Sequence, residues 1–525
     1  MKVLLLFCCI FIGNFGIVTS AKILALHVHD ERSHLFSMAP FLKTLSESGH
    51  EVTVFDSASD SKPAKLGFNA TVVHSYLPAY EPHQKFVSTF FWEHDPHAAV
   101  TGLVHKTADE EMGRLILQRA DKFVELLKYD YNLVIVDELS TIYGMTIAKM
   151  LKELKGTPYV VFTTPNVGAE SNVAELALGH TPVLDATRGT VLPSGHGDVY
   201  DQHNFLLRVD NVLEAMGEYG ALSFWVPSLL GYENPEKLGV TSFDTLDVVR
   251  NAEMNIRESL DRLGRIAPIG DDFRSVGSHC KDFSPLPKDL ADFVEDPTSK
   301  GTIYIAFGTI VNFNTCPHFV FEAFFNAMNQ FPEYRIIMST RNLTLRTLPK
   351  LNKNVKIVHW APQTAILAHP KTKLFMTHGG LKSFKEALCG KVPVVFMPIS
   401  AEQGMITRVS MKMGLGTALS KYTVTSEAMI TAFNEVLQNS TYKENMEKTY
   451  EYFLDRIIPS LDEGAWYIDK LIRRVDLLGL RAASLPNDEQ SLLFFRRRGI
   501  SLPSYKYFGF DWILAGIGLC YFLAK

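Results

Sequence analysis

The sequence has few cysteines, no excess of basic charge and no repeated or low-complexity segment. It contains 525 residues with six cysteines, and its formal net charge is −5. Because a general basic surface is missing, the composition argues against a nucleic-acid partner. The lack of a repeat with a period of about 20 to 50 residues excludes solenoid architectures. An apolar fraction of 46% can build a core in each of at least two domains.

The cysteines are too dispersed for a disulfide framework or a zinc site. Cys8 and Cys9 lie in an apolar N-terminal run, and Cys520 lies in a C-terminal one. The cysteines outside these runs are Cys280, Cys316 and Cys389. Disulfide-rich and zinc-binding sequences space their cysteines closely and regularly. We therefore expect these three to be free, buried thiols.

Both ends of the chain are apolar. Residues 1–21 combine one lysine, a long apolar run and small residues at the end, which is the pattern of a cleaved secretory signal peptide. Residues 507–524 are apolar except for Asp511, and a helix of that length covers roughly 27 Å of a bilayer core about 30 Å thick. The sequence thus predicts a single-pass transmembrane anchor over 507–524, after a juxtamembrane segment over 481–506.

The predicted anchor has an alternative and a conflicting charge signal. Asp511 leaves only 512–524 uninterrupted, so a buried or interfacial helix is the alternative. Four basic residues between 496 and 506 precede the segment and only Lys525 follows it, the reverse of the positive-inside preference for a lumenal protein. Orientation therefore depends on the signal peptide, which predicts the endoplasmic reticulum membrane with both domains in the lumen.

Three Asn-x-Ser/Thr triplets agree with a lumenal chain. They begin at Asn69, Asn342 and Asn439, and each is a potential acceptor of an N-linked glycan. Because such triplets also occur by chance, they agree with the lumen without proving it.

Strand and helix patterns alternate in two separate series. Strand, helix and strand recur from residue 22 to residue 163, and a second series begins at residue 302. A stretch rich in proline and charge, 278–301, lies between them. The pattern predicts an α/β fold of two Rossmann-like domains facing a cleft, over 22–275 and 276–480.

A strand, turn and helix in the second series suit an anion. The buried strand, the short helix and the following strand cover 373–377, 381–390 and 392–398. His378, Gly379 and Gly380 fall in the first turn, at the expected carboxyl edge of a parallel sheet. The N–H groups of a helix N-terminus, approached closely past glycine, bind phosphate there. Taken alone, the glycine pair could equally form a tight turn.

The surrounding residues resemble a known signature. The segment HWAPQTAILAHPKTKLFMTHGGLKSFKEALCGKVPVVFMPISAEQ, 359–403, resembles the donor-binding signature of the UDP-glycosyltransferases, the GT-B family that includes UDP-glucuronosyltransferases. The similarity extends to ERSHLFSMAPFLKTLSESGHEVTVF, AFGT, AWYIDKLIRR and both apolar ends, so it covers nearly the whole chain. The resemblance implies a GT-B fold, N-terminal acceptor-binding and C-terminal donor-binding domains, and a UDP-sugar donor substrate without a cofactor.

The resemblance also implies roles for single residues. Trp360 would stack on uracil, Glu386 would accept from the ribose hydroxyls, and His378 would contact the diphosphate. Glu402 and Gln403 occupy the positions of an Asp-Gln pair that binds sugar hydroxyls. The full implied UDP-sugar site is Gly308, Thr309, Trp360, Gln363, His378, Gly379, Gly380, Lys382, Ser383, Glu386, Glu402 and Gln403.

Three positions depart from the family pattern. Glu402 is one methylene longer than the usual aspartate, and Lys382 and Ile406 stand where relatives have asparagine. A lysine beside the diphosphate could stabilise the leaving group, and a solvent-facing lysine is the alternative. UDP-glucose, UDP-glucuronate and UDP-galactose therefore remain open as donors.

The resemblance implies a general base and its partner. His34 matches the base, and Asp137, at the end of an apolar strand, matches the residue that orients it, with Glu138 as an adjacent competitor. The implied reaction inverts the sugar in a single displacement by a hydroxyl. No Asp-x-Asp motif occurs, which disfavours the metal-dependent glycosyltransferase design.

Two other functions remain open at this stage. A membrane-anchored, non-catalytic binder of UDP-sugar or a lipophile would suit the departures at Lys382 and Ile406. A metal-dependent hydrolase would use the His-x-His of HVHD, 27–30, although no further ligand set is recognisable. For a transferase, the aromatic stretch 165–265 suggests a small lipophilic acceptor, and a homo-oligomer is a further expectation.

Overall fold

A computed structural model describes the two domains and a C-terminal helix. The described residues are 20–27, 32–78, 88–94, 101–138, 142–164, 203–221, 233–240, 243–258, 273–309, 311–340, 343, 347–400, 402–477, 502, 506 and 509–524. Most of the predicted signal peptide and juxtamembrane segment, and the sequon at Asn342, lie outside them.

The first domain is built on a seven-stranded parallel sheet with the order β3-β2-β1-β4-β5-β6-β7. The strand order reverses between β1 and β4, and open α/β sheets bind ligands at the carboxyl edge beside such a reversal. The strands are β1 (Lys22–His27), β2 (Glu51–Ala58), β3 (Thr71–Tyr76), β4 (Leu133–Asp137), β5 (Tyr159–Thr163), β6 (Met254–Arg257) and β7 (Phe273–Ser275).

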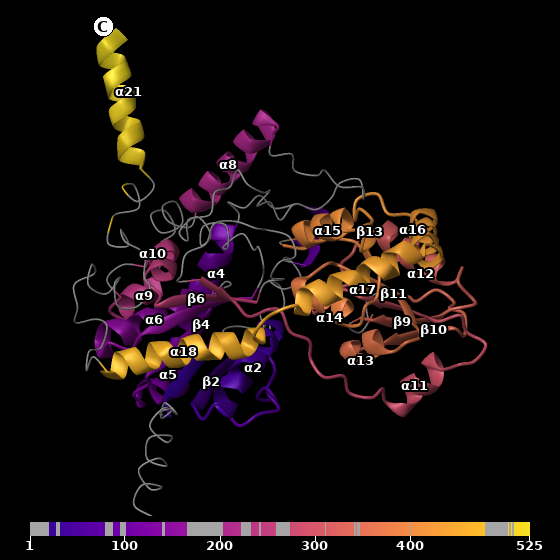
Figure 1. The fold of residues 1–525 in the computed structure, drawn as a ribbon, viewed down its shortest axis with the longest axis horizontal. Coiled ribbons are helices and arrows are strands. Elements are labelled where there is room, and N and C mark those ends of the chain that lie inside the picture. Colours follow the sequence, from indigo (N-terminus) through magenta and orange to yellow (C-terminus); the bar gives the residue numbers. More distant parts are fainter. Residues whose placement is uncertain are drawn as a thin grey trace, which may run out of the picture.

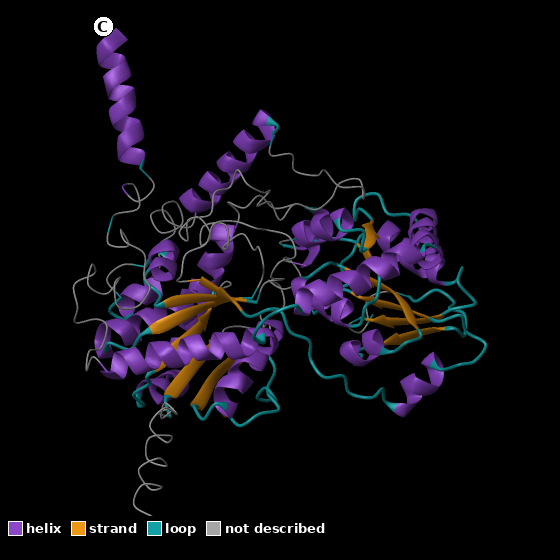
Figure 2. Cartoon of the chain, in the orientation of Figure 1, coloured by secondary structure: helices purple, strands orange, loops and turns teal. Residues whose placement is uncertain are grey.

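Helices cover both faces of this sheet, as Figure 2 shows. Successive side chains of β1 point to opposite faces, so Leu24 and Leu26 join one apolar core and Ile23 and Ala25 join the other. Burial on both faces explains why the strands read as continuous apolar runs. The helices are α2 (Arg32–Glu47), α4 (Thr101–Gln118), α5 (Ala120–Leu127), α6 (Ile142–Lys155), α8 (Phe205–Gly220), α9 (Glu233–Lys237) and α10 (Thr245–Arg250).

The second domain repeats the plan with a six-stranded parallel sheet of order β10-β9-β8-β11-β12-β13. Here the order reverses between β8 and β11. The strands are β8 (Thr302–Ala306), β9 (Arg335–Ser339), β10 (Val355–Val358), β11 (Thr372–Thr377), β12 (Val394–Phe396) and β13 (Gly416–Ala418). The helices are α11 (Lys288–Val294), α12 (His318–Met328), α13 (Gln363–Ala368), α14 (Leu381–Cys389), α15 (Gln403–Lys412), α16 (Ser426–Gln438) and α17 (Ser440–Leu454).

Each domain receives one segment from the other half of the chain. Helix α18 (Ser460–Leu477) returns to the first domain, where Ile468 is fully buried in a core shared with α2 (Figure 1). The helical segment 88–93 crosses the other way, and Trp92 is buried in the core of the second domain. The Trp92 indole Nε1 donates to the Asn312 carbonyl at 3.1 Å. The predicted range 276–480 thus includes a helix that packs on the first sheet.

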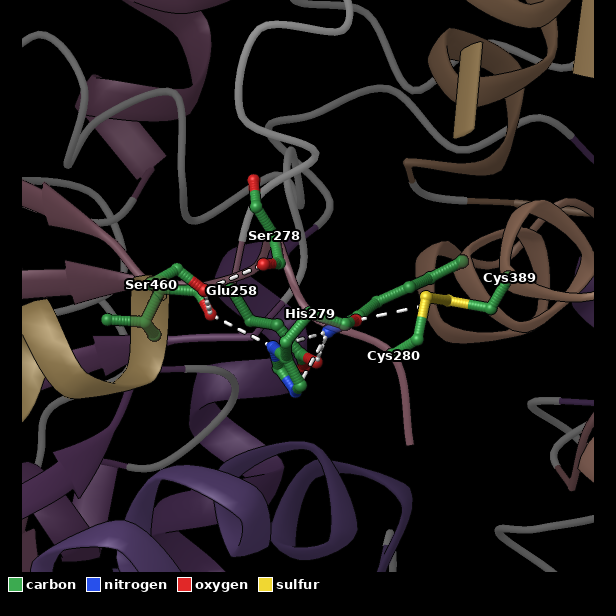
Figure 3. Close-up of a disulfide and its surroundings, with 8 residues drawn as sticks. Glu258, Ser278, His279, Cys280, Cys389 and Ser460 are labelled. Carbon is green, nitrogen blue, oxygen red and sulfur yellow. Dashed lines mark hydrogen bonds and ion pairs between the residues drawn. A yellow bond between two sulfur atoms is a disulfide. The ribbon is translucent and has the colours of Figure 1, made fainter. Parts of the chain in front are cut away.

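The prediction of three free thiols is wrong for two of them. Cys280 and Cys389 form a disulfide with a Cα–Cα distance of 5.7 Å (Figure 3). Cys316 is a buried thiol, as predicted. The two partners lie 109 residues apart, so spacing gave no sign of the bridge. Folding brings them together because the segment after β7 passes the C-terminal end of α14.

The described C-terminal residues form α21 (Phe510–Ala524), which extends away from both domains (Figure 1). Among the described residues, no helix has both the length and the apolar character needed to cross a membrane. Of the sequons, Asn69 and Asn439 are exposed. Asn439 also caps α17, since its side-chain oxygen accepts from the Thr441 backbone N–H at 3.0 Å.

Peptide mapping of the unreduced protein should recover the Cys280 and Cys389 peptides as one linked species. Cys316 should react with an alkylating reagent only after unfolding, because it is buried. The bridge closes a long loop, so Cys280→Ser/Cys389→Ser should lower the free energy of unfolding by about 2 to 4 kcal/mol in chemical denaturation. Ready alkylation of Cys280 and Cys389 in the native, unreduced protein would contradict the bridge.

Candidate active site

His34 and Asp137 meet at the carboxyl edge of the first sheet. His34 lies in the first turn of α2, which follows β1, and Asp137 is the last residue of the neighbouring strand β4. The His34 Nδ1 and Asp137 Oδ2 atoms are 2.9 Å apart. The Asp137 side chain is buried, and its Oδ1 atom accepts from the Thr164 hydroxyl at 3.2 Å. The competitor Glu138 is also buried.

This geometry fixes the chemistry open to His34. A carboxylate accepts a hydrogen bond, so Asp137 holds the proton of His34 on Nδ1 and leaves the lone pair on Nε2. The His34 ring is only 14% exposed but is not sealed from solvent. Its Nε2 can therefore take a proton from a hydroxyl group, and Asp137 can stabilise the resulting cation.

On the second sheet, His378 follows β11 and lies between two glycine turns. Gly308 has φ +71° and Gly379 has φ +88°, left-handed values that favour glycine. A Cβ atom on Gly308 would lie 3.0 Å from His378 Cε1, and one on Gly380 would lie 2.7 Å from His378 Nε2. Glycine is therefore needed at Gly308 and Gly380 to leave room for the imidazole.

Burial keeps the His378 imidazole neutral. Loss of solvent lowers the pKa of His378 to about 4, and its Nδ1 atom lies 3.1 Å from the Thr377 hydroxyl. If that hydroxyl donates to Nδ1, the Nε2–H group is the donor left for an anion. Gly380 precedes the first turn of α14 and brings no capping side chain, so the amides of this helix end can face the same anion.

A hydrogen-bonded group of side chains joins α13 to α14. Gln363 Nε2 donates to Glu386 Oε2 at 2.6 Å and to the Ser383 hydroxyl at 3.2 Å. The Tyr304 hydroxyl donates to Gln363 Oε1 at 3.2 Å, and burial together with the nearby Glu386 charge raises the pKa of Tyr304. Glu386 is thereby oriented through one oxygen, and its second oxygen can accept from a ligand.

Trp360 has the exposure of a stacking platform. Its indole is 74% exposed, in the segment between β10 and α13 that leads directly to Gln363. A large aromatic side chain usually becomes buried, so an exposed one beside a polar group is available for a flat ring. Thr309 follows Gly308 on the other side of His378 and is partly exposed.

Glu402 immediately precedes α15, which begins at Gln403, and the two side chains differ in their burial and contacts. The Gln403 side chain is buried, and its Oε1 atom accepts from the Ile399 and Ser400 backbone N–H groups at 2.8 and 3.1 Å. Glu402 Oε1 lies 3.4 Å from the Leu381 nitrogen, at the N-terminus of α14. Burial raises the pKa of Glu402. A diphosphate at the same helix end would compete with this carboxylate.

Lys382 carries its charge at the junction of the two domains. Its ammonium lies 5.4 Å from the centre of the Phe36 ring, and Phe36 is on α2, two residues beyond His34. Burial and the neighbouring Lys281 lower the pKa of Lys382 to about 8. Ile406, the other residue that departs from the family pattern, is buried in an apolar core of the second domain, so it is not a sugar contact.

The structure therefore gathers the predicted residues into two groups that face each other. His34 and Asp137 belong to the first domain, and the predicted donor residues belong to the second. The two groups adjoin at the junction of the domains, where the Lys382 ammonium lies over the Phe36 ring of α2. His27, from the alternative metal motif, is buried with Nδ1 3.6 Å from Asp56 Oδ1. No cluster of three or more potential metal ligands occurs within the part of the chain that the structure describes.

Three residues at the junction were missed by sequence reasoning. Lys385 and Glu258 form a buried ion pair of 2.9 Å, and His279 lies beside the same ammonium. A lysine in the middle of a short helix carries no signal of such a partner, because a helix surface normally presents lysine to solvent.

Comparison with known families decides the relationship. A family model described as "UDP-glucoronosyl and UDP-glucosyl transferase" matches residues 21–485. The chain belongs to this family. Its members are glycosyltransferases, so the predicted enzyme class is confirmed.

Two relatives that match this UDP-glycosyltransferase over most of its length are distantly similar to it. It is 25% identical over 504 residues to UDP-glucuronosyltransferase 2B13 of Oryctolagus cuniculus, which covers 92% of this chain and 89% of the relative. It is 24% identical over 484 residues to UDP-glycosyltransferase UGT5 of Dactylopius coccus, covering 90% and 86%. A UDP-glucuronosyltransferase of Pleuronectes platessa is 34% identical over 204 residues, which covers 38% of this chain and 41% of the relative.

Solved structures support the fold. The glycotransferase of kitacinnamycin has a TM-score of 0.57 at 16% identity, with 86% of this chain and all of that chain covered. Spinosyn forosaminyltransferase SpnP has a TM-score of 0.56 at 17% identity, covering 87% of this chain and all of its own. With two parallel-sheet domains, the predicted GT-B fold is confirmed.

Gly380→Ala should weaken UDP binding. The added Cβ would lie 2.7 Å from His378 Nε2 and would displace the imidazole from the helix end. Loss of one such polar contact corresponds to an affinity about ten-fold lower in titration calorimetry. Gly516→Ala is the control, since its Cβ meets nothing within 4 Å. Equal UDP affinity in the two variants would show that the His378 turn does not bind the nucleotide.

Proposed function

We propose that this protein transfers glucuronic acid or a hexose from a UDP-sugar to a hydroxyl group of a small lipophilic acceptor, with inversion. The observation that carries the proposal is the His34–Asp137 pair, with 2.9 Å between Nδ1 and Oδ2. It lies at the sheet edge that faces the nucleotide-binding signature. Orientation of the histidine by a carboxylate suits a general base, a role that a binder without catalysis does not require.

In the proposed reaction, one proton moves to His34 and one electron pair leaves with UDP. His34 Nε2 takes the proton of the acceptor hydroxyl as the oxygen attacks the anomeric carbon from the face opposite UDP. The bond from that carbon to the diphosphate oxygen breaks, and its electron pair leaves with UDP. Asp137 stabilises the His34 cation until the proton passes to solvent.

The leaving group would be held by the second domain. Trp360 would stack on uracil, and the free oxygen of Glu386 would accept from the ribose. Neutral His378 and the amides at the start of α14 would donate to the diphosphate, where the developing charge is greatest. Lys382 would add a positive charge beside it, and Gln403 and Glu402 would face the sugar hydroxyls.

The cellular setting is part of the proposal. The apolar N-terminal run supports entry into the endoplasmic reticulum, and the apolar C-terminal helix supports attachment to its membrane. Both catalytic domains would then lie in the lumen, where an oxidising environment suits the Cys280–Cys389 bridge. Conjugation of lipophilic compounds, as in detoxification, would suit an enzyme at that surface.

His34→Ala should abolish transfer without preventing donor binding. Removal of a general base lowers kcat by about 100- to 10,000-fold, and Asp137→Asn should also lower it because the wrong tautomer of His34 is favoured. Transfer is measured by mass spectrometry over UDP-glucuronate, UDP-glucose and UDP-galactose with phenolic and steroidal acceptors. UDP affinity should stay within about three-fold of the wild type. UDP binding by the wild type without transfer to any acceptor would favour the non-catalytic binder.

Lys382 should make UDP binding depend on pH. Its pKa of about 8 is below the ordinary lysine value, so the ammonium is charged at pH 7 and loses its proton as the pH rises through 8. A charged hydrogen bond to phosphate would then be lost, and the Kd for UDP should rise about ten-fold between pH 7 and pH 9. Lys382→Met should bind weakly at both pH values. Parallel pH profiles for the two proteins would exclude Lys382 from the phosphate site.

A further inference from the structure

One face of α14 makes the contacts of this helix with the first domain and with the segment that follows β7. The contacts come from three residues spaced three and four positions apart, which places them on one side of the helix: Lys382, Lys385 and Cys389. Each reaches the first domain or the segment that follows it. Lys382 lies over Phe36 of α2, and Cys389 is bonded to Cys280.

Lys385 makes the central contact of this face. Its ammonium lies 2.9 Å from Glu258 Oε1, and both side chains are buried, at 8% and 5% exposure. Glu258 follows β6 at the carboxyl edge of the first sheet, where its backbone N–H donates to the Thr163 carbonyl at 2.9 Å. The ion pair therefore joins the donor helix directly to the sheet that carries Asp137.

His279 completes the contact as a neutral ring (Figure 3). Its Nδ1–H group donates to the Val276 carbonyl at 3.0 Å, and both ring nitrogens lie 3.1 Å from the Lys385 ammonium. Burial and the Lys385 charge lower the pKa of His279 to about 3. The Lys385 charge also holds the pKa of Glu258 below its ordinary value, although burial alone would raise it.

The contact adjoins the residues that face the nucleotide. A single pocket is lined by Glu258, His279 and Lys385 from the contact and by Thr364 and Glu386 from the side of Gln363. Glu386 is the next residue after Lys385 on α14. A shift of the helix against the first sheet would thus move the nucleotide group and change its distance from His34.

We propose that Lys385 is a positioning residue, which docks α14 on the first sheet through Glu258 and His279 and so fixes the donor against His34. This inference rests on the proposed transferase function. A buried ion pair adds little net stability, but it fixes the relative position of the two elements that carry it. The proposed nucleotide contacts all belong to the second domain, so an effect on UDP binding can be separated from an effect on positioning.

The test compares Lys385→Met, the double variant Lys385→Met/Glu258→Met and the control Lys288→Met. Lys288 is 88% exposed and pairs with Asp292 on the same helix. Lys385→Met should lower kcat at least ten-fold and leave the Kd for UDP within three-fold. The double variant removes both charges together and should regain thermal stability, because no buried charge is left unpaired. It should nevertheless keep the low kcat.

The double variant separates positioning from stability. A double variant that is stable and turns over at the wild-type rate would overturn the proposal, since a purely structural pair is replaceable by apolar side chains. Hydrogen exchange provides a readout that needs no turnover. Lys385→Met should speed exchange in 276–282 and in α14 relative to Lys288→Met, and unchanged exchange would overturn the docking. If the wild type transfers no sugar, the proposed function fails, while the exchange measurement still tests the docking.

Discussion

The active site depends on one constraint of parallel sheets: neighbouring strands all end on the same edge. In the first sheet this constraint brings the loop after β1 beside the end of β4, so His34 meets Asp137 across 103 residues of chain. In the second sheet it brings Gly308, after β8, beside His378, after β11. Glu402 follows β12 on the same edge. Since both edges face one junction, the base and the nucleotide group oppose each other without a dedicated connecting element.

Burial controls the charges that surround this junction. His378 loses its charge on burial, which leaves an imidazole that can donate to an anion without carrying a full charge of its own. Lys382 stays protonated at neutral pH, although burial lowers its pKa to about 8, close to neutral pH. Burial raises the pKa of Glu402 and so favours the neutral form of its carboxyl group. The three shifts together reduce the electrostatic cost of keeping the site formed before a diphosphate arrives.

Sequence reasoning found the features that have a local signal. Alternating apolar runs predicted the two sheets, and the resemblance selected His34 and Asp137, which the structure brings within 2.9 Å. It missed the Cys280–Cys389 bridge because a pair separated by 109 residues leaves no periodic mark. For a similar reason, sequence reasoning did not predict that α18 packs on the first domain or that the segment around Trp92 packs on the second. Their apolar patterns predict burial but do not say which core they enter.

The connection between the domains is held from both sides, which limits how they can move. On one side, the Ser460 hydroxyl at the start of α18 lies 3.0 Å from the carbonyl oxygens of Val276 and Ser278. On the other side, the disulfide ties Cys280 to α14. Only the backbone around His279 remains between these two attachments, and its ring contacts Lys385. A rotation that separates the domains must therefore disturb the Lys385 contact, so the same side chains that position the donor also resist separation of the two domains.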